Sequence, residues 1–150
     1  MLRINRLSDY ALVLLSHMAA APTPRPARAW VEESGLPDPT VRKLLKELAH
    51  AGLVVARRGP LGGYALARPA AAVSVADVLA AIEGPLSPTV CTTTGEACTL
   101  QDRCPTTGAW HRLAGSLRGV LERTTLADLI NPPAASTPAA APIARIEVSP

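Results

Sequence analysis

The sequence contains no phenylalanine, and aromatic residues make up only 3% of its 150 residues. Because 48% of the residues are nonetheless hydrophobic, mostly alanine, leucine and valine, we expect a core packed with aliphatic side chains. No stretch approaches the roughly 18 apolar residues that indicate a membrane-spanning helix. The sequence also lacks a recognisable nucleophile–base pair, a phosphate-binding loop and a substrate domain. We therefore expect neither a membrane protein nor an enzyme.

The N-terminus has only a superficial likeness to a secretory signal peptide. Arg3 and Arg6 precede the apolar residues 11–15, and alanine-rich sequence follows. However, Asp9 stands before the apolar run, and a polar pair interrupts its continuation. The run also keeps the spacing of an amphipathic helix. These features predict a cytoplasmic protein.

The net charge of +3 conceals an uneven distribution. Residues 39–68 carry a local charge of +5, because six basic side chains stand against Glu47 alone, and the rest of the chain sums to −2. The basic side chains are Arg42, Lys43, Lys46, Arg57, Arg58 and Arg68. A basic segment of this kind predicts a polyanionic partner, although a solvated face would have the same composition.

Residues 27–51 have the pattern of a helix-turn-helix motif. Gly35 should end the first helix, because glycine readily takes the left-handed conformation that follows a helix. Asp38 as the N-cap and Pro39 in the first turn should begin the second helix, which Gly52 closes. This helix has a basic outer face and an apolar stripe for the core. The stripe consists of Val41, Leu44, Leu45 and Leu48.

A β-hairpin should follow this motif directly. Short strands are expected over residues 53–57 and 64–67, and the glycine-rich residues 58–63 should form the turn between them. A hairpin in this position is the wing of a winged helix-turn-helix. Further helices are expected over about residues 8–20, with Ser8 as N-cap, and over about 75–83.

A long helix over about residues 106–123 and a short one over 124–130 complete the expected fold. The long helix repeats apolar side chains at helical offsets, and little core remains to be built this far along the chain, so we interpret it as a dimerisation helix. Its stripe consists of Trp110, Leu113, Leu117, Val120 and Leu121. The predicted fold class is mainly α with a small β-hairpin: a winged helix-turn-helix with a long C-terminal dimerisation helix.

The chain should therefore divide into four parts. We expect a winged helix-turn-helix DNA-binding domain over residues 1–84, a cysteine loop over 85–105 and a dimerisation helix region over 106–130. Residues 131–150 are proline, alanine and serine with few large apolar side chains, a composition that predicts a disordered tail.

All three cysteines, Cys91, Cys98 and Cys104, lie in one polar loop, with six residues between the first two and five between the last two. No helix or strand with a buried face fits this segment, so something else must order it. Thiolates are soft ligands that bind zinc, copper(I) or iron–sulfur clusters. The alternatives are a disulfide with one free thiol, unligated buried cysteines and structural zinc. The polar loop and the absence of closely spaced cysteine pairs argue against the last two.

Further motifs accompany the cysteines and resemble one family. Residues 58–64 read Arg-Gly-Pro-Leu-Gly-Gly-Tyr and resemble the wing of the winged-helix regulators that include the iron–sulfur assembly regulator IscR and the nitric oxide sensor NsrR. Residues 2–11 resemble the first helix of these proteins. The resemblance covers about residues 1–130 and is nearest to the branch that regulates the sulfur-mobilisation (SUF) cluster assembly operon.

This resemblance implies a homodimeric repressor that binds double-stranded operator DNA and an iron–sulfur cluster, with 2Fe–2S as first choice and 4Fe–4S as second. The implied cluster ligands are Cys91, Cys98, Cys104 and Asp9. Asp9 matches the position from which the NsrR type supplies an aspartate. The histidine position of the IscR type holds Thr107 here, and His111 lies four residues later, so His111 stays an alternative fourth ligand.

The resemblance also implies how DNA is bound. The second helix of the motif should enter the major groove, and Arg58 at the wing tip should enter a narrow minor groove. The wing glycines should let the backbone approach the phosphates closely. The candidate DNA contacts are Thr40, Arg42, Lys43, Lys46, Arg58, Gly59, Gly62 and Gly63. The alternative functions are a nitric oxide or redox sensor of the same fold and a structural-zinc interaction module.

Overall fold

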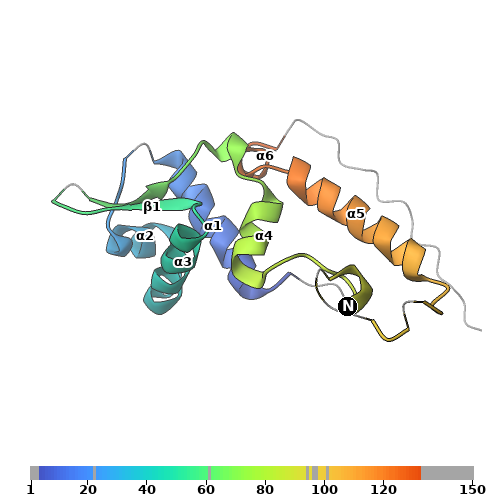
Figure 1. The fold of residues 1–150 in the computed structure, drawn as a ribbon. Coiled ribbons are helices and arrows are strands. Elements are labelled where there is room, and N and C mark those ends of the chain that lie inside the picture. The colour runs from blue at the N-terminus through green and yellow to red at the C-terminus, as the bar shows by residue number, and fades with distance from the viewer. Residues whose placement is uncertain are drawn as a thin grey trace, which may run out of the picture.

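The computed structural model describes residues 4–21, 23–60, 62–93, 95, 98–100 and 102–132. Its elements are α1 (Arg6–Ala20), α2 (Ala27–Ser34), α3 (Asp38–His50), β1 (Val54–Arg57), β2 (Gly63–Leu66), η1 (Ala70–Ala72), α4 (Val75–Glu83), η2 (Val90–Thr92), α5 (Thr107–Arg123) and α6 (Leu126–Ile130). Helices α1 to α4 pack together, the hairpin projects from them at one end, and α5 extends from the other end beside α4 (Figure 1). The predicted fold class, mainly helical with one small hairpin, is confirmed.

The core is aliphatic and surrounds one tryptophan. Trp30 of α2 is fully buried among leucine, valine and alanine side chains from α1, α3 and the first strand. The predicted stripe of α3 is confirmed, because Val41, Leu44, Leu45 and Leu48 are all buried. Burial of such side chains stabilises a fold by about 1.5–3 kcal/mol each, so this stripe fixes α3 against α1 and α2 and leaves its other face outside.

The expected N-cap of α1 is wrong by one turn. Asn5 is the cap, and its side chain accepts a hydrogen bond from the Leu7 N–H at 3.1 Å. Ser8 lies inside the helix and is fully buried. Its hydroxyl donates to Oε1 of Glu83, at the end of α4, and the Asn5 N–H donates to the same oxygen at 3.1 Å. A partner 75 residues away in the chain therefore decides the role of Ser8.

The turn between α2 and α3 is close to the prediction, with one correction. Gly35 ends α2 in the left-handed conformation, at φ +67°, as predicted. Asp38, however, is the first residue of α3 and not its N-cap. The N–H groups of Thr40 and Val41 donate to the carbonyl of Pro37, at 2.9 and 3.0 Å. The Asp38 carboxylate is thereby left to bind Arg42 instead.

The hairpin is antiparallel, with Val54 paired to Leu66 and Arg57 paired to Gly63. The second strand begins one residue earlier than expected, at Gly63. The backbone of Arg25 pairs with Tyr64 on the other edge of this strand through two hydrogen bonds of 3.1 and 2.8 Å. The wing is therefore held from the segment before α2 as well as by its own turn.

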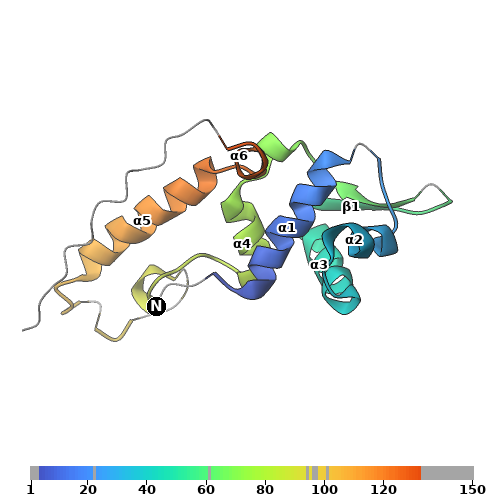
Figure 2. The same ribbon diagram turned by 180° about the vertical axis from the view of Figure 1, so that it is seen from behind.

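Helix α4 begins with a capping box, in which Ser74 and Asp77 exchange hydrogen bonds of 3.0 Å. Thr125 and Asp128 cap α6 in the same way. The segments before these two helices pair with each other, and the buried Leu126 joins the core. Seen from behind, α1 crosses in front of α3 and α4, whereas α5 lies away from α1 and α3 (Figure 2). Thus α6 attaches the far end of α5 to the winged helix.

The predicted tail and the predicted division of the chain are not tested by the structure. Residues 133–150 of the predicted disordered tail lie outside the described residues. The division of the chain after residues 84, 105 and 130 stays a prediction. Among the helices of the described ranges, none combines the length and the apolar character that a membrane crossing requires.

Candidate DNA interface and metal centre

The outer face of α3 presents the four side chains that the sequence nominated for a DNA contact. Arg42, Lys43 and Lys46 are exposed, and Thr40 is half-buried. They occupy the face opposite the buried stripe, so packing of that stripe turns them toward solvent together. This arrangement suits a helix that enters the major groove of DNA.

The basic side chains on this face differ in how they are held. Arg42 Nε donates to Asp38 Oδ2 at 2.8 Å, whereas Lys43 Nζ lies 3.8 Å from Glu47 Oε1, beyond hydrogen-bond distance. Lys46 has no ion-pair partner within the described part of the chain. The hydrogen bond and the charge of Asp38 hold the pKa of Arg42 above its ordinary value. Arg42 is thus the cation on this face that has a hydrogen-bonded acidic partner among the described residues.

The wing carries Arg57, Arg58, Gly59 and Pro60 at its exposed end. The hairpin points away from the helices, so its turn is the most distant part of this end of the molecule (Figure 1). Gly59 has φ +113°, and a Cβ there would meet nothing within 4 Å. The Gly62 N–H donates to the Gly59 carbonyl at 2.9 Å and closes the turn. Arg58 is therefore exposed at the end of the wing, among the described residues of the turn.

Gly62 and Gly63 have an internal structural role that the sequence analysis missed. A Cβ on Gly62 would lie 2.3 Å from the Arg57 carbonyl oxygen, and one on Gly63 would lie 2.2 Å from the Arg25 carbonyl oxygen. Gly63 also has φ +141°, a conformation open to glycine. Both glycines are therefore required by contacts inside the protein, whatever the wing does on DNA.

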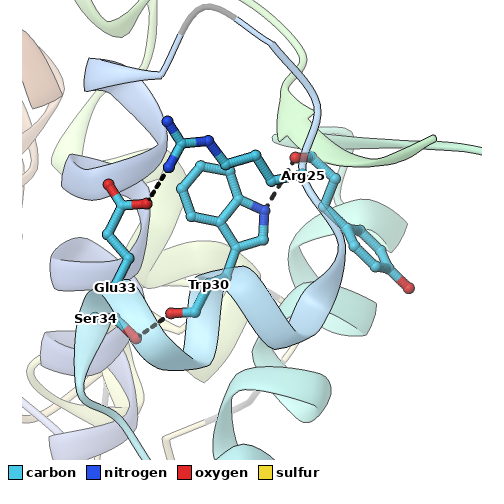
Figure 3. Close-up of polar contacts among 5 residues, drawn as sticks. Arg25, Trp30, Glu33 and Ser34 are labelled. Carbon is cyan, nitrogen blue, oxygen red and sulfur yellow. Dashed lines mark hydrogen bonds and ion pairs between the residues drawn. The ribbon is translucent and has the colours of Figure 1, made fainter. Parts of the chain in front are cut away.

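The root of the wing is fixed by a polar network around Trp30 (Figure 3). The indole Nε1 donates to the Tyr64 carbonyl at 3.1 Å. The Arg25 guanidinium lies 5.5 Å from the centre of the indole ring and forms an ion pair with Glu33. The sequence analysis assigned no functional role to Trp30 and no hydrogen-bond partner to its N–H. A buried indole almost always needs such a partner, and that requirement was the available signal.

The three cysteines occupy different positions around the loop. Cys91 lies in η2, Cys98 follows in the loop, and Cys104 stands just before α5; each is half-buried with a free thiol. The Cys91 sulfur is 3.2 Å from the Thr89 hydroxyl, and the Cys104 sulfur is 3.2 Å from the Thr106 hydroxyl. Hydrogen bonds from Thr106 and then Thr107 lower the pKa of Cys104 to about 7. A thiolate, the form that binds metals, is therefore accessible at this residue near neutral pH.

These donors fit a metal centre in chemical type but are not assembled into one in the described chain. Cys91 and His111 line one cavity of about 300 Å³, together with Arg118. Asp9 lines a different cavity, together with Arg6 at the start of α1 and Ile4 just before the helix. Among the described residues, no three histidine, cysteine, aspartate or glutamate side chains lie together as a metal site. Among the described residues, the predicted ligands Asp9 and Cys91 thus line separate cavities, and the assignment of Asp9 as fourth ligand stays a prediction.

Helix α5 has an uncovered apolar face. Only Ala114 is buried, whereas Trp110 is 37% exposed, Leu113 is 53% exposed and Val120 is 52% exposed. The helix packs against α4 and η2, which leaves this face to solvent in the single chain. A row of large apolar side chains on one helix face is typical of an interaction surface.

The beginning of the cysteine loop lies near the residues that precede α1. Ile4, Glu83, Pro85 and Ser87 line one cavity of about 270 Å³ there. The Glu83 carboxylate holds the first turns of α1 through the Asn5 N–H and the Ser8 hydroxyl. Glu83, at the end of α4 and next to the loop, thereby links both segments to the first turns of α1, which carry Asp9.

Comparisons with known proteins agree with these features. Residues 4–132 match the Rrf2 family, described as iron-dependent transcriptional regulators. A helix-turn-helix transcriptional regulator from Mycobacterium tuberculosis is 33% identical over 130 residues, which cover 85% of this chain and 81% of the relative. The helix-turn-helix regulator IscR from Escherichia coli is 30% identical over 132 residues, which cover 87% of this chain and 81% of IscR.

Solved structures of transcriptional regulators are also similar to this chain. CymR of B. subtilis, described as a global cysteine regulator, superposes with a TM-score of 0.69 and 29% identity, over 87% of this chain and 97% of CymR. The T. potens IscR structure superposes with a TM-score of 0.65 and 27% identity, over 86% of each chain. The relatives are regulators rather than enzymes, and the winged-helix resemblance is confirmed.

Proposed function

The chain belongs to the Rrf2 family of iron-dependent transcriptional regulators, and on that premise we propose that it is a homodimeric, iron–sulfur-cluster-dependent repressor of SUF-type cluster assembly genes. The observation that carries this proposal is the position of the three cysteines. All lie in the segment that joins the DNA-binding helices to the uncovered helix α5. A metal centre there would bear on DNA binding and on subunit association together.

The DNA-binding part of the proposal rests on α3 and the wing. The outer face of α3 enters the major groove through Thr40, Arg42, Lys43 and Lys46. Arg58 enters a neighbouring minor groove, where a narrow A·T tract concentrates negative potential. The Arg25–Tyr64 pairing supports this assignment, because it holds the wing in a defined direction relative to α2 and α3.

The homodimer rests on α5. Burial of Trp110, Leu113 and Val120 against the same face of a second copy would remove the exposed apolar surface by the self-complementary contact that a two-fold axis creates. Two winged helices held in this way could reach half-sites about 34–36 Å apart, one turn of DNA. The protein would then act on chromosomal DNA in the cytoplasm.

For the cluster, the ligands we propose are Cys91, Cys98 and Cys104, with a 2Fe–2S centre preferred to 4Fe–4S. When bound, the cluster supplies a link between these thiolates that depends on iron and on redox state. Asp9 is the proposed fourth ligand and would act as Asp9 of the partner subunit, since within one chain it lines a separate cavity. His111 is the alternative within the same chain, because it shares a cavity with Cys91.

The chain's own contacts suggest how loop order reaches the DNA-binding helices. The loop starts two residues after Glu83, whose carboxylate holds Asn5 and Ser8 at the start of α1. Its other end continues into α5, which packs against α4. Ordering the loop would therefore bear on α1 and on the subunit interface, the two features that set the spacing of the α3 helices.

One observation favours a second candidate, a thiol-based redox sensor of the same fold. The Thr106 hydroxyl lies 3.2 Å from the Cys104 sulfur, and hydrogen bonds from Thr106 and then Thr107 lower the pKa of Cys104 to about 7, which favours its thiolate without any metal. Such a sensor would respond to oxidant or nitric oxide through the thiols themselves.

Anaerobic purification with analysis of iron, sulfide and zinc distinguishes these functions. We expect coloured protein that contains iron and sulfide, and we expect Cys91→Ala, Cys98→Ala and Cys104→Ala each to abolish the visible absorbance. Thr99→Ala, an exposed loop substitution without a thiol, is the matched control and should keep it. Colourless protein with zinc would indicate the interaction module, and colourless metal-free protein that still binds its operator would indicate the thiol sensor.

For the fourth ligand, Asp9→Ala and His111→Ala should be compared in the same preparation. We expect the loss of absorbance from Asp9→Ala alone. Loss from His111→Ala alone would move the assignment to the helix that follows the loop. A normal cluster in both variants would point to Glu96, which lies outside the described residues, or to an external ligand.

A further inference from the structure

The ion pair between Asp38 and Arg42 stands out on the outer face of α3. Arg42 Nε donates to Asp38 Oδ2 at 2.8 Å, although the side chains remain 61% and 48% exposed. Asp38 is the first residue of the helix, where the helix dipole favours a carboxylate. It also precedes Arg42 by four residues, the favourable order for a helical pair. Two local effects therefore favour this contact in the absence of DNA.

The geometry leaves the recognition edge of Arg42 available. A guanidinium carries five N–H donors in a rigid fork, and the contact with Asp38 uses the one on Nε. The N–H groups on the two terminal nitrogens remain, and they match the O6 and N7 acceptors of guanine in the major groove. Lys43 and Lys46 on the same face lack a comparable hydrogen bond. Arg42 is the side chain of this set that is already oriented.

The position of Asp38 is unfavourable for affinity alone. A carboxylate on a face that meets DNA repels the phosphates, and it partly cancels the charge of the neighbouring arginine. It would weaken binding to any sequence. Asp38 is useful at this position if the binding free energy gained by orienting Arg42 on the correct base exceeds the binding free energy lost by repulsion between the carboxylate and the phosphates.

We infer that Asp38 is a positioning residue for DNA recognition: it holds Arg42 for bidentate reading of one guanine, and it lowers affinity for DNA that lacks this base. This inference rests on the proposed DNA-binding function of α3. It assigns sequence discrimination to a carboxylate that need not touch DNA itself.

The test begins with the full-length wild-type protein and a library of random duplexes. Selection on the wild type defines the operator. The same selection and titrations are then made with Asp38→Asn, Arg42→Ala and the double variant. We expect Arg42→Ala to relax one guanine position, with a loss of discrimination of about 5- to 150-fold. We expect Asp38→Asn to relax the same position and to bind scrambled duplex more tightly than the wild type. The double variant should be no less selective there than Arg42→Ala.

Glu32→Gln is the matched control. Glu32 forms an exposed ion pair with Arg28, four residues away on α2, at 3.0 Å. Its loss removes the same type of helical pair without touching α3. The operator preference should therefore stay unchanged. Thermal unfolding of each variant separates a general loss of helix stability from a change in base preference, because a mere stabilising contact would weaken binding on all sequences equally.

Each outcome is decisive. If Asp38→Asn keeps the wild-type preference at every position, or relaxes a different base pair from Arg42→Ala, the positioning role is wrong. If the wild type enriches no sequence at all, the proposed regulatory function fails, and the inference fails with it. Relaxation of one shared guanine by both variants, with unchanged preference in Glu32→Gln, supports it.

Discussion

The close approach of the wing to Arg25 leads to a quantitative prediction for Gly63→Ala. A new Cβ would lie 2.2 Å from the Arg25 carbonyl oxygen and 2.8 Å from the Pro26 nitrogen. Both are backbone atoms, so no side-chain rotation relieves the overlap. The strand has to move away from Arg25.

The expected loss has two parts. The φ of +141° at residue 63 costs a non-glycine residue about 1–3 kcal/mol. Separation from Arg25 breaks two backbone hydrogen bonds, each worth about 0.5–1.5 kcal/mol net. If the Tyr64 carbonyl also leaves the buried Trp30 indole without an acceptor, about 1–3 kcal/mol more is lost. The second part therefore amounts to about 2–6 kcal/mol, a large share of the stability of about 5–15 kcal/mol that is typical of a domain.

Gly59→Ala is a matched control, because Gly59 has φ +113° but no neighbour within 4 Å of the added Cβ. It should lose the conformational part alone. We would measure urea unfolding of both variants and the wild type without metal, by far-UV circular dichroism, and compare free energies at equal m-values. A Gly63→Ala loss no greater than that of Gly59→Ala would refute the view that packing against Arg25 fixes the wing.

Three further predictions address the rest of the molecule. Glu83→Ala should lower the free energy of unfolding by about 1–3 kcal/mol, because the buried Ser8 hydroxyl loses its acceptor. Ser8→Ala in that background should lower it little further. Additive losses in a double-mutant cycle measured by urea unfolding would contradict the contact. Leu117→Glu should yield monomers in sedimentation and abolish operator binding, and a variant that stays dimeric would exclude the α5 face as the seam. Lys46→Ala should weaken binding to all duplexes and lower the slope of log affinity against log salt by about one per subunit, whereas Arg58→Ala should weaken the operator more than scrambled DNA; equal losses from Arg58→Ala would limit the wing to backbone contacts.

Much of the fold could be predicted from the sequence because its signals act within a few residues. The left-handed Gly35, the Ser74 capping box and the spacing of the buried leucines on α3 each involve neighbours on one helix turn or on one helix face. The wing motif and the basic outer face of α3 were recognisable for the same reason, since the residues that carry them are adjacent in the chain.

Two expected N-caps are wrong, and in both cases the side chain binds another partner. Ser8 has the composition of a cap but is drawn into the interior by Glu83. Asp38 is likewise suited to a cap, but Arg42 stands one turn away and takes its carboxylate. Gly62 and Gly63 stay predicted DNA contacts, and the structure adds a second role, because the backbones of Arg57 and Arg25 exclude a Cβ there.

The sequence by itself therefore determined the helices, the hairpin, the family and the three thiols of the loop. Only the tertiary structure decided that Arg25 forms the outer edge of the wing, that α5 leaves its apolar face uncovered and that Asp9 and Cys91 line separate cavities. The physical reason is the distance along the chain over which each interaction acts. Capping and helical periodicity are local properties of the backbone, but burial and approach depend on which distant segments the packed core brings together.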